Sequence, residues 1–275
     1  MADIQQFIQD LLSSDNNRRT AAYKELVAAK DAALEPLLAV LGGQNAALRV
    51  EAAHVLTQFA DPRAIPTFIN LTKDSDKQMR YWATVGLGMF KGQAGVAEAL
   101  AQVARQDSEV STRRFAVQGL DRMGEHAMAN DIRLEMLGSQ DEQLAREAIS
   151  GLAKAGDTRV VEPLISLLNG KPSNLLLAFA LDALGKLRHP RAFEAIAPHV
   201  QASAPYRRAV AAQALGELGD ARAVELLNQL KHDSATAWEE DRGPKRSVGD
   251  IANEALKKLG GAPAGDKDRP WWKVW

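Results

Sequence analysis

Hydrophobic positions recur along this chain with a nearly constant period. At eight places an alanine is followed four residues later by a leucine, which is the spacing of side chains on one face of a helix. Successive leucines of these pairs are 30, 31, 33, 32, 32, 31 and 41 residues apart. A fixed period of this length predicts a stacked array of repeats rather than a globule with one core. The pairs are Ala22/Leu26, Ala52/Leu56, Ala83/Leu87, Ala116/Leu120, Ala148/Leu152, Ala180/Leu184, Ala211/Leu215 and Ala252/Leu256.

Each repeat is predicted to contain two helices. In the third repeat, residues 64–71 carry apolar side chains at helical spacing, and a polar break precedes the helix that holds Ala83. Asp76 stands seven residues before this alanine, where its side chain can accept from the free N–H groups of the first turn. The equivalent positions in other repeats hold Asp15, Asn45, Glu109, Asp141 and Ser173. Gly124, Gly156 and Gly219 are placed to end helices in the left-handed conformation.

The alanine and leucine of each pair mark a buried stripe on the second helix. The third position after the alanine is mostly small, so the paired helix can approach closely there. The series of alanine and leucine pairs is therefore expected to form a packing seam between helices. Each buried leucine in it should contribute about 1.5 to 3 kcal/mol to the free energy of unfolding. The small residues are Gly86, Gly119, Gly151, Ala183, Ala214 and Ala255.

The linkers between repeats carry the resemblance to a known family. Segments such as Asp61-Pro62-Arg63-Ala64-Ile65-Pro66, His189-Pro190-Arg191-Ala192 and Asp220-Ala221-Arg222-Ala223-Val224 resemble the short HEAT-like repeats of phycobilisome lyase-type proteins. The resemblance covers about residues 3 to 260. It implies an all-α chain, folded as a right-handed α/α superhelical solenoid of about eight HEAT-like helix pairs. Proteins with this repeat include bilin lyase subunits, helper domains of enzymes and plain scaffolds.

An arginine three residues before the alanine accompanies the resemblance. It occurs as Arg19, Arg49, Arg80, Arg113 and Arg208. We expect each guanidinium to bridge to a carboxylate or a helix end of the adjacent repeat, as the family's arginines do; the alternative is a row that binds anions. Ala145, Leu177 and Gly249 replace the arginine in repeats five, six and eight. Repeats five and six should therefore meet through more apolar contacts.

The face of the second helices opposite the seam is predicted to line the concave side of the solenoid, where such proteins usually bind partners. Its aromatic, amide and basic groups suit a peptide or a protein segment. Trp82, Phe115 and Phe179 border this face, and the alternative is that these three are buried between repeats. The predicted partner-binding residues on the helices are His54, Tyr81, Trp82, Arg114, Gln118, Arg146, Asp182 and Gln213.

The composition of the chain excludes or disfavours several classes of partner and of chemical site. The formal net charge is −1, from 34 Lys and Arg against 35 Asp and Glu, which disfavours nucleic acid and anionic membranes as partners. There is no cysteine, no run of apolar residues long enough to cross a membrane, and no pair of the five histidines at the i, i+4 spacing of a helical metal site. We therefore expect a cytoplasmic protein that is not an enzyme and needs no cofactor or metal. A HEAT-like DNA glycosylase using Trp82, Arg114 and Asp182 is a remote alternative.

Two segments near the C-terminus depart from the repeat. About ten extra residues fall in 233–247, predicted to be a long loop between the helices of the last pair, and Trp238 lies in it. Residues 1–260 are expected to form the solenoid, followed by a flexible linker and a Trp-rich peptide in 261–275 with Trp271, Trp272 and Trp275. Tryptophan is enriched at binding hot spots, so this peptide is predicted to cap the chain's own last repeat or to dock on another protein or a second copy.

Together these patterns predict a non-catalytic scaffold or adaptor that binds another protein or peptide along its concave face, with the C-terminal peptide as a docking or self-capping element. The alternative from another class is a bilin lyase or a lyase-like subunit that handles a chromophore. No residue of the sequence is specific for a lyase.

Overall fold

The computed structural model describes residues 3–237 and 245–260. Within these residues the chain forms sixteen α-helices and three short 3-10 helices, and its β structure is limited to one isolated bridge between Thr236 and Ser247. The helices are α1 (Ile4–Asp10), α2 (Asn16–Ala28), α3 (Lys30–Leu41), α4 (Ala46–Thr57), η1 (Pro62–Ala64), α5 (Ile65–Leu71), α6 (Lys77–Leu87), α7 (Val96–Gln106), α8 (Val110–Met123), α9 (His126–Met136), α10 (Glu142–Ala155), η2 (Thr158–Val160), α11 (Val161–Asn169), α12 (Asn174–Leu187), α13 (Ala192–Ile196), η3 (Ala197–Gln201), α14 (Pro205–Leu218), α15 (Ala223–Leu230) and α16 (Val248–Gly260).

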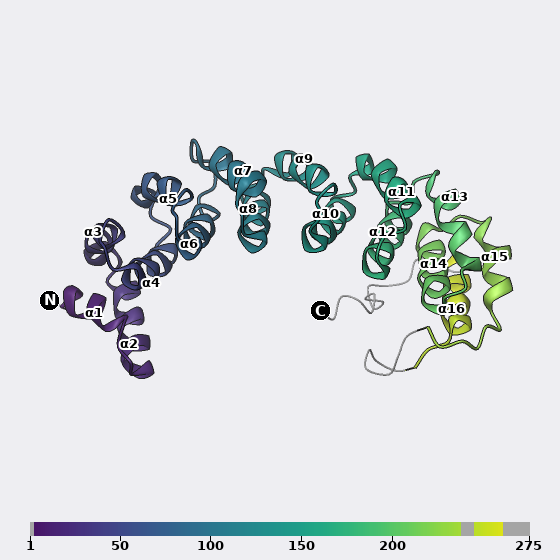
Figure 1. The fold of residues 1–275 in the computed structure, drawn as a ribbon, viewed down its shortest axis with the longest axis horizontal. Coiled ribbons are helices and arrows are strands. Elements are labelled where there is room, and N and C mark those ends of the chain that lie inside the picture. The colour runs from purple at the N-terminus through teal and green to yellow at the C-terminus, as the bar shows by residue number, and fades with distance from the viewer. Residues whose placement is uncertain (1–2, 238–244, 261–275) are drawn as a thin grey trace. The chain divides into compact units, whose positions relative to one another are not determined.

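The α-helices follow one another as eight pairs, which confirms the predicted all-α repeat solenoid (Figure 1). The chain divides into two compact units between Ile132 and Arg133, and α9 spans this division. In the first unit the second helices α2, α4, α6 and α8 pack on one another in order, while α3, α5 and α7 cover them from the other side. The second unit repeats this arrangement with α10, α12, α14 and α16 as its second helices.

The alanine and leucine pairs form the seam that their spacing predicts. All eight alanines are buried, and so are seven of the eight leucines. Leu256 in α16 is half-buried, as expected for the final helix of a stack, because no later repeat packs against it within the described residues. The small residues of the stripe also have their predicted role: a Cβ added at Gly86 would lie 2.7 Å from the ring of Phe68 in the paired helix α5.

The predicted helix ends are mostly confirmed. Asp76 accepts a hydrogen bond from the N–H of Gln78 at 2.8 Å, and the side chains of Asp15, Asn45, Asp141 and Ser173 cap their helices in the same way. Glu109 occupies the capping position of α8 without a side-chain bond, since glutamate is one methylene longer than the residues that suit this position. The three glycines Gly124, Gly156 and Gly219 end their helices in the left-handed conformation, with φ of 92°, 68° and 77°.

Apolar packing replaces the arginine in the fifth and sixth repeats, as predicted. Ala145 and Leu177, which stand where other repeats have arginine, are both buried in one continuous apolar cluster. This cluster extends from α10 through α12 and α14 to α16. The second unit is therefore held together along its length by aliphatic contacts between its second helices.

A long connection joins α15 to α16 in the last pair. Its two described ends run antiparallel: the N–H of Ala237 donates to the carbonyl of Arg246 at 2.9 Å, and the N–H of Val248 donates to that of Ala235 at 3.0 Å. Ala237 is buried, so the start of the connection packs on the unit. Trp238 and the remainder of the loop to residue 244 lie outside the described residues.

Candidate functional site

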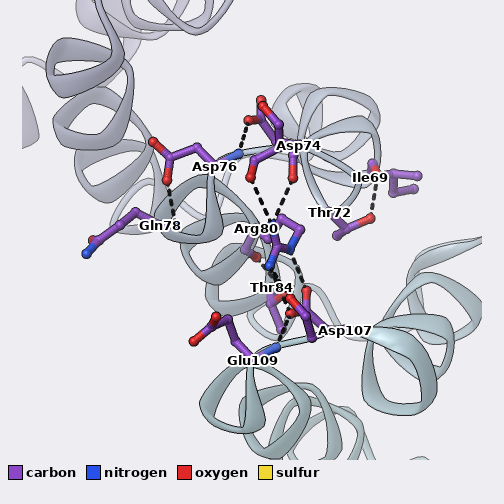
Figure 2. Close-up of polar contacts among 11 residues, drawn as sticks. Ile69, Thr72, Asp74, Asp76, Gln78, Arg80, Thr84, Asp107 and Glu109 are labelled. Atoms are coloured by element: carbon purple, nitrogen blue, oxygen red, sulfur yellow. Dashed lines mark hydrogen bonds and ion pairs between the residues drawn. The ribbon is translucent and has the colours of Figure 1, made fainter.

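Three of the five arginines that precede the seam pair with an aspartate of the next repeat, as predicted. Arg80 of α6 donates to both carboxylate oxygens of Asp107, at 2.8 and 3.2 Å, and to the backbone carbonyls of Asp74 and Ser75 (Figure 2). Asp107 precedes α8, so the guanidinium links the third repeat to the fourth. The pair is largely covered, with side-chain exposures of 14% for Arg80 and 2% for Asp107.

The other arginines of the series divide into those that reach the next repeat and those that bond within their own. Arg49 pairs with Asp74 of the next repeat and donates to the carbonyl of Leu41, while Arg208 pairs with Asp233 at 2.8 Å. Arg19 and Arg113 donate to backbone carbonyls of their own repeats. All five guanidinium groups therefore have partners in the described structure, which favours a structural role over the alternative of an anion-binding row, and the predicted bridge to the adjacent repeat holds for Arg49, Arg80 and Arg208.

A second recurring position supports the arginines, and the sequence analysis missed it. In four repeats, a short polar side chain nine residues before the alanine accepts from the N–H of the capping residue and so closes the turn. In the third and fourth repeats this residue is the aspartate that receives an arginine. The signal is visible in the sequence as an aspartate or serine two positions before four of the capping residues: Ser13, Asp74, Asp107 and Ser139.

With the arginines assigned to structure, the candidate site is a continuous row of rings on the second helices of the first unit. The row starts at Tyr23 in α2, whose ring centroid lies 5.0 Å from that of His54 in α4. His54 stacks on Trp82 in α6 at 4.1 Å with 19° between the ring planes. Tyr81 contacts Trp82 edge-on at 5.0 Å and Phe115 in α8 at 5.1 Å. We call Tyr23, His54, Trp82, Tyr81 and Phe115 the aromatic row.

All five members of the aromatic row are half-buried, so each ring packs against its neighbours and still keeps part of its surface open. The two readings of Trp82 and Phe115 as groove residues or as side chains buried between repeats are therefore both partly met. Large rings held in place by their neighbours and still accessible are typical of binding hot spots. Tyr23 was not among the predicted site residues.

The two ends of the aromatic row carry opposite charges. Glu51 of α4 is close enough to Tyr23 and His54 to act on both electrostatically. At the other end the guanidinium of Arg114 lies 5.6 Å from the centroid of Phe115, and its Nε is buried without a hydrogen-bond partner among the described residues. Gln118, also predicted as a site residue, is half-buried one turn further along α8. The first unit thus brings His54, Tyr81, Trp82, Arg114 and Gln118 onto one set of adjacent helices.

Burial in the row shifts the acid–base properties of two rings. The pKa of Tyr23 is raised by burial and, in addition, by the negative charge of Glu51. The pKa of His54 is lowered from its usual 6.5 because burial disfavours the imidazolium, and Glu51 offsets only part of this effect. His54 is therefore neutral at neutral pH, which suits its stacking on the indole of Trp82.

We predict that His54 titrates with a midpoint below 6.5, measured by NMR on its imidazole protons. The unfolded chain then takes up the proton first, so His54 reduces the free energy of unfolding as the pH falls below about 6.5. Replacing Trp82 by alanine exposes the imidazole and should move the midpoint upward. A midpoint at or above 6.5 in the unaltered chain would contradict the packing described for the row.

In the described part of the second unit the predicted site residues are Arg146, Asp182 and Gln213, none of which is aromatic. The guanidinium of Arg146 in α10 lies 5.8 Å from the ring of Phe179 in α12, and both side chains are half-buried. Gln213 in α14 is half-buried as well. Of the predicted residues described in this unit, Arg146 is therefore the one that lies over a ring.

Asp182 is a correction to the predicted site. It is buried, with 8% of its surface exposed, and its carboxylate accepts from the ammonium of Lys186 at 2.7 Å. The reason is the close packing of α12 on α14, where Gly185 faces the backbone of Ala214. The carboxylate named for the glycosylase alternative is therefore buried and paired with Lys186.

The remaining predicted contacts, Trp238, Trp271, Trp272 and Trp275, lie outside the described residues. Within the described part of the chain, no group of three or more histidine, aspartate or glutamate side chains is placed to hold a metal ion. A search of the same residues found no helix with the length and apolar character of a membrane span.

Comparison with known proteins supports the repeat assignment. A family model described as HEAT repeats matches residues 34–121, 97–176, 130–216 and 161–238. No curated protein matches the sequence significantly. Among solved structures, the chain is similar to the complex of CpcE and CpcF of phycocyanin lyase from a Nostoc species, with 24% identity, coverage of 83% of this chain and 93% of that one, and a TM-score of 0.42.

Two further solved structures are similar over most of this chain. An engineered protein shares 17% identity, with coverage of 94% of this chain and 78% of that one and a TM-score of 0.48. Human deoxyhypusine hydroxylase in complex with glycerol shares 20% identity, with coverage of 94% and 96% and a TM-score of 0.38.

Proposed function

This chain belongs to the HEAT repeat family, and on that basis we propose that it is a non-catalytic binding protein that holds an extended segment of another protein on the aromatic row of its first unit. HEAT repeats typically bind protein partners. The observation that carries the proposal is the continuity of the row, in which five half-buried rings from α2, α4, α6 and α8 contact one another in sequence.

The dimensions of the row suit a short peptide segment. Packed helices lie about 8 to 10 Å apart, so a row across four of them spans roughly 24 to 30 Å. An extended chain advances about 3.3 Å per residue, and eight or nine residues would therefore cover it. Preformed rings lose little side-chain freedom on binding, which favours affinity.

The test is a selection of random displayed peptides with the full chain, followed by affinity measurements on the peptides obtained. We predict that Tyr81→Ala and Trp82→Ala each weaken binding at least tenfold, or about 1.4 kcal/mol. Phe193→Ala is the matched control, because Phe193 also packs against an arginine, Arg222 at 4.1 Å, but on a helix of the second unit. Circular dichroism checks that each variant folds. Peptides that bind all three variants equally would count against the aromatic row.

The C-terminal peptide is tested by the same measurement. We propose residues 261–275 as a second contact element, and a chain ending at residue 260 should keep its helicity and melt as before while binding its partner more weakly. Unchanged affinity of this shortened chain for a partner protein would remove the peptide from the proposal. The alternative of a bilin lyase subunit has its own readout, since it requires bilin absorbance to appear on an acceptor protein after incubation with this chain.

A further inference from the structure

The two ends of the aromatic row carry opposite charges, and this restricts the kind of ligand that can lie along it. Glu51 acts electrostatically on its first two rings, and Arg114 lies over its last with a buried Nε that has no hydrogen-bond partner among the described residues. A segment lying along the row therefore meets a carboxylate at one end and a guanidinium at the other. A complementary segment carries a cationic residue near Glu51 and an anionic residue near Arg114.

The row also offers hydrogen-bond donors that the chain itself does not use. The hydroxyls of Tyr23 and Tyr81 and the indole N–H of Trp82 donate to no group within the described residues, and all three side chains are partly open to solvent. A partner that displaces water from these donors must supply acceptors in its place. A backbone that presents carbonyls along its length while making no internal hydrogen bonds meets this requirement.

The known modes of peptide binding can be compared with these features. Strand addition needs a sheet edge, and the described part of the chain has only an isolated bridge. Binding of an amphipathic helix needs a broad apolar groove, whereas this row is made of polar rings as well as Phe115 and has a charge near each end. Recognition of a phosphorylated motif needs a cluster of arginines, and among the described contacts of the row the one cation over a ring is Arg114. A polyproline II segment fits, because such segments dock on lines of aromatic rings that donate hydrogen bonds to their carbonyls.

We infer that the ligand of the aromatic row is a proline-rich segment in the polyproline II conformation, with a basic and an acidic residue placed to meet Glu51 and Arg114. The inference rests on the proposed function and adds the class of ligand to it. Glu51 and Arg114 lie on α4 and α8, two helix spacings apart, or roughly 16 to 20 Å. At 3.1 Å per residue this distance corresponds to about five or six residues between the two charges.

The test begins from the peptides selected with the full chain, because a random library does not favour any one mode. We expect enrichment of proline together with a lysine or arginine about five or six residues from a glutamate or aspartate. Arg114→Gln should weaken such a peptide about tenfold, yet leave unchanged the affinity of the same peptide with its acidic residue replaced by glutamine. Glu51→Gln should act in the same way on the basic residue.

The outcomes separate this inference from the proposed function. Selected peptides that depend on Tyr81 and Trp82 but lack proline, or fold as helices when bound, would overturn the inference and leave the proposed function in place. Indifference of proline-rich binders to both Arg114→Gln and Glu51→Gln would overturn the predicted charge pattern. If no selected peptide depends on the row at all, the proposed function and the inference both fall.

Discussion

Replacing Arg80 by methionine is expected to lower the free energy of unfolding by about 3 kcal/mol, the range found when one partner of a covered ion pair is removed. The change leaves the carboxylate of Asp107, which is only 2% exposed, without its guanidinium. It also removes the donors to the carbonyls of Asp74 and Ser75 before α6. Methionine keeps most of the aliphatic volume, so the loss reports the polar contacts rather than a cavity. Urea denaturation followed by circular dichroism measures it.

Two further variants make the result specific. Arg63→Met removes an arginine that is 53% exposed and pairs with Asp61 at 2.8 Å, and it should change the free energy of unfolding by less than about 1 kcal/mol. Combining Arg80→Met with Asp107→Asn also removes the unpaired carboxylate charge of Asp107. The double variant should therefore recover part of the lost free energy of unfolding. An Arg80→Met chain as stable as the Arg63→Met chain would show that the inter-repeat bridge does not hold the two repeats together.

Much of the architecture could be predicted because it repeats. Three features recur at the same position of all or most repeats. They are the alanine and leucine spacing, the helix caps equivalent to Asp76, and the arginine equivalent to Arg80. A feature that recurs with the period must serve the one contact that also recurs, which is the packing of a repeat on its neighbours. This is why the arginines could be assigned to structure from the sequence.

The aromatic row could not be assembled in the same way. Its members occupy different positions relative to the alanine: Tyr23 lies one after it, His54 two after it, and Trp82 and Phe115 one before it. These rings meet only through the packing of successive second helices on one another, which no single repeat encodes. Sequence reasoning placed most of these residues on the exposed flank, but the contacts between them depend on the geometry of stacking.

Asp182 shows that position within a repeat can fail to predict the exposure of a side chain. It has the same position in its repeat as His54 and Gln118, which are half-buried, but it is almost fully buried. The difference comes from a residue outside the pattern used for the prediction. Gly185 lies one turn further along α12 and brings α14 so close that this flank of the helix is covered. Position within a repeat predicts exposure only while the spacing between helices stays constant.

Replacing Gly185 by alanine is accordingly expected to destabilise the second unit by about 2 kcal/mol, although alanine is the better helix former by about 1 kcal/mol. A Cβ at this position would lie 2.6 Å from the carbonyl oxygen of Ala214 and 3.1 Å from its Cα, and backbone atoms cannot turn aside as a side chain can. The two helices must separate, which loosens the apolar cluster that runs through both. Gly138→Ala is the control, since the nearest atom to its Cβ would be 3.8 Å away, and it should leave the free energy of unfolding within about 0.5 kcal/mol. A Gly185→Ala chain that gains stability would mean that helix propensity outweighs the contact and that α12 and α14 are not held at this distance.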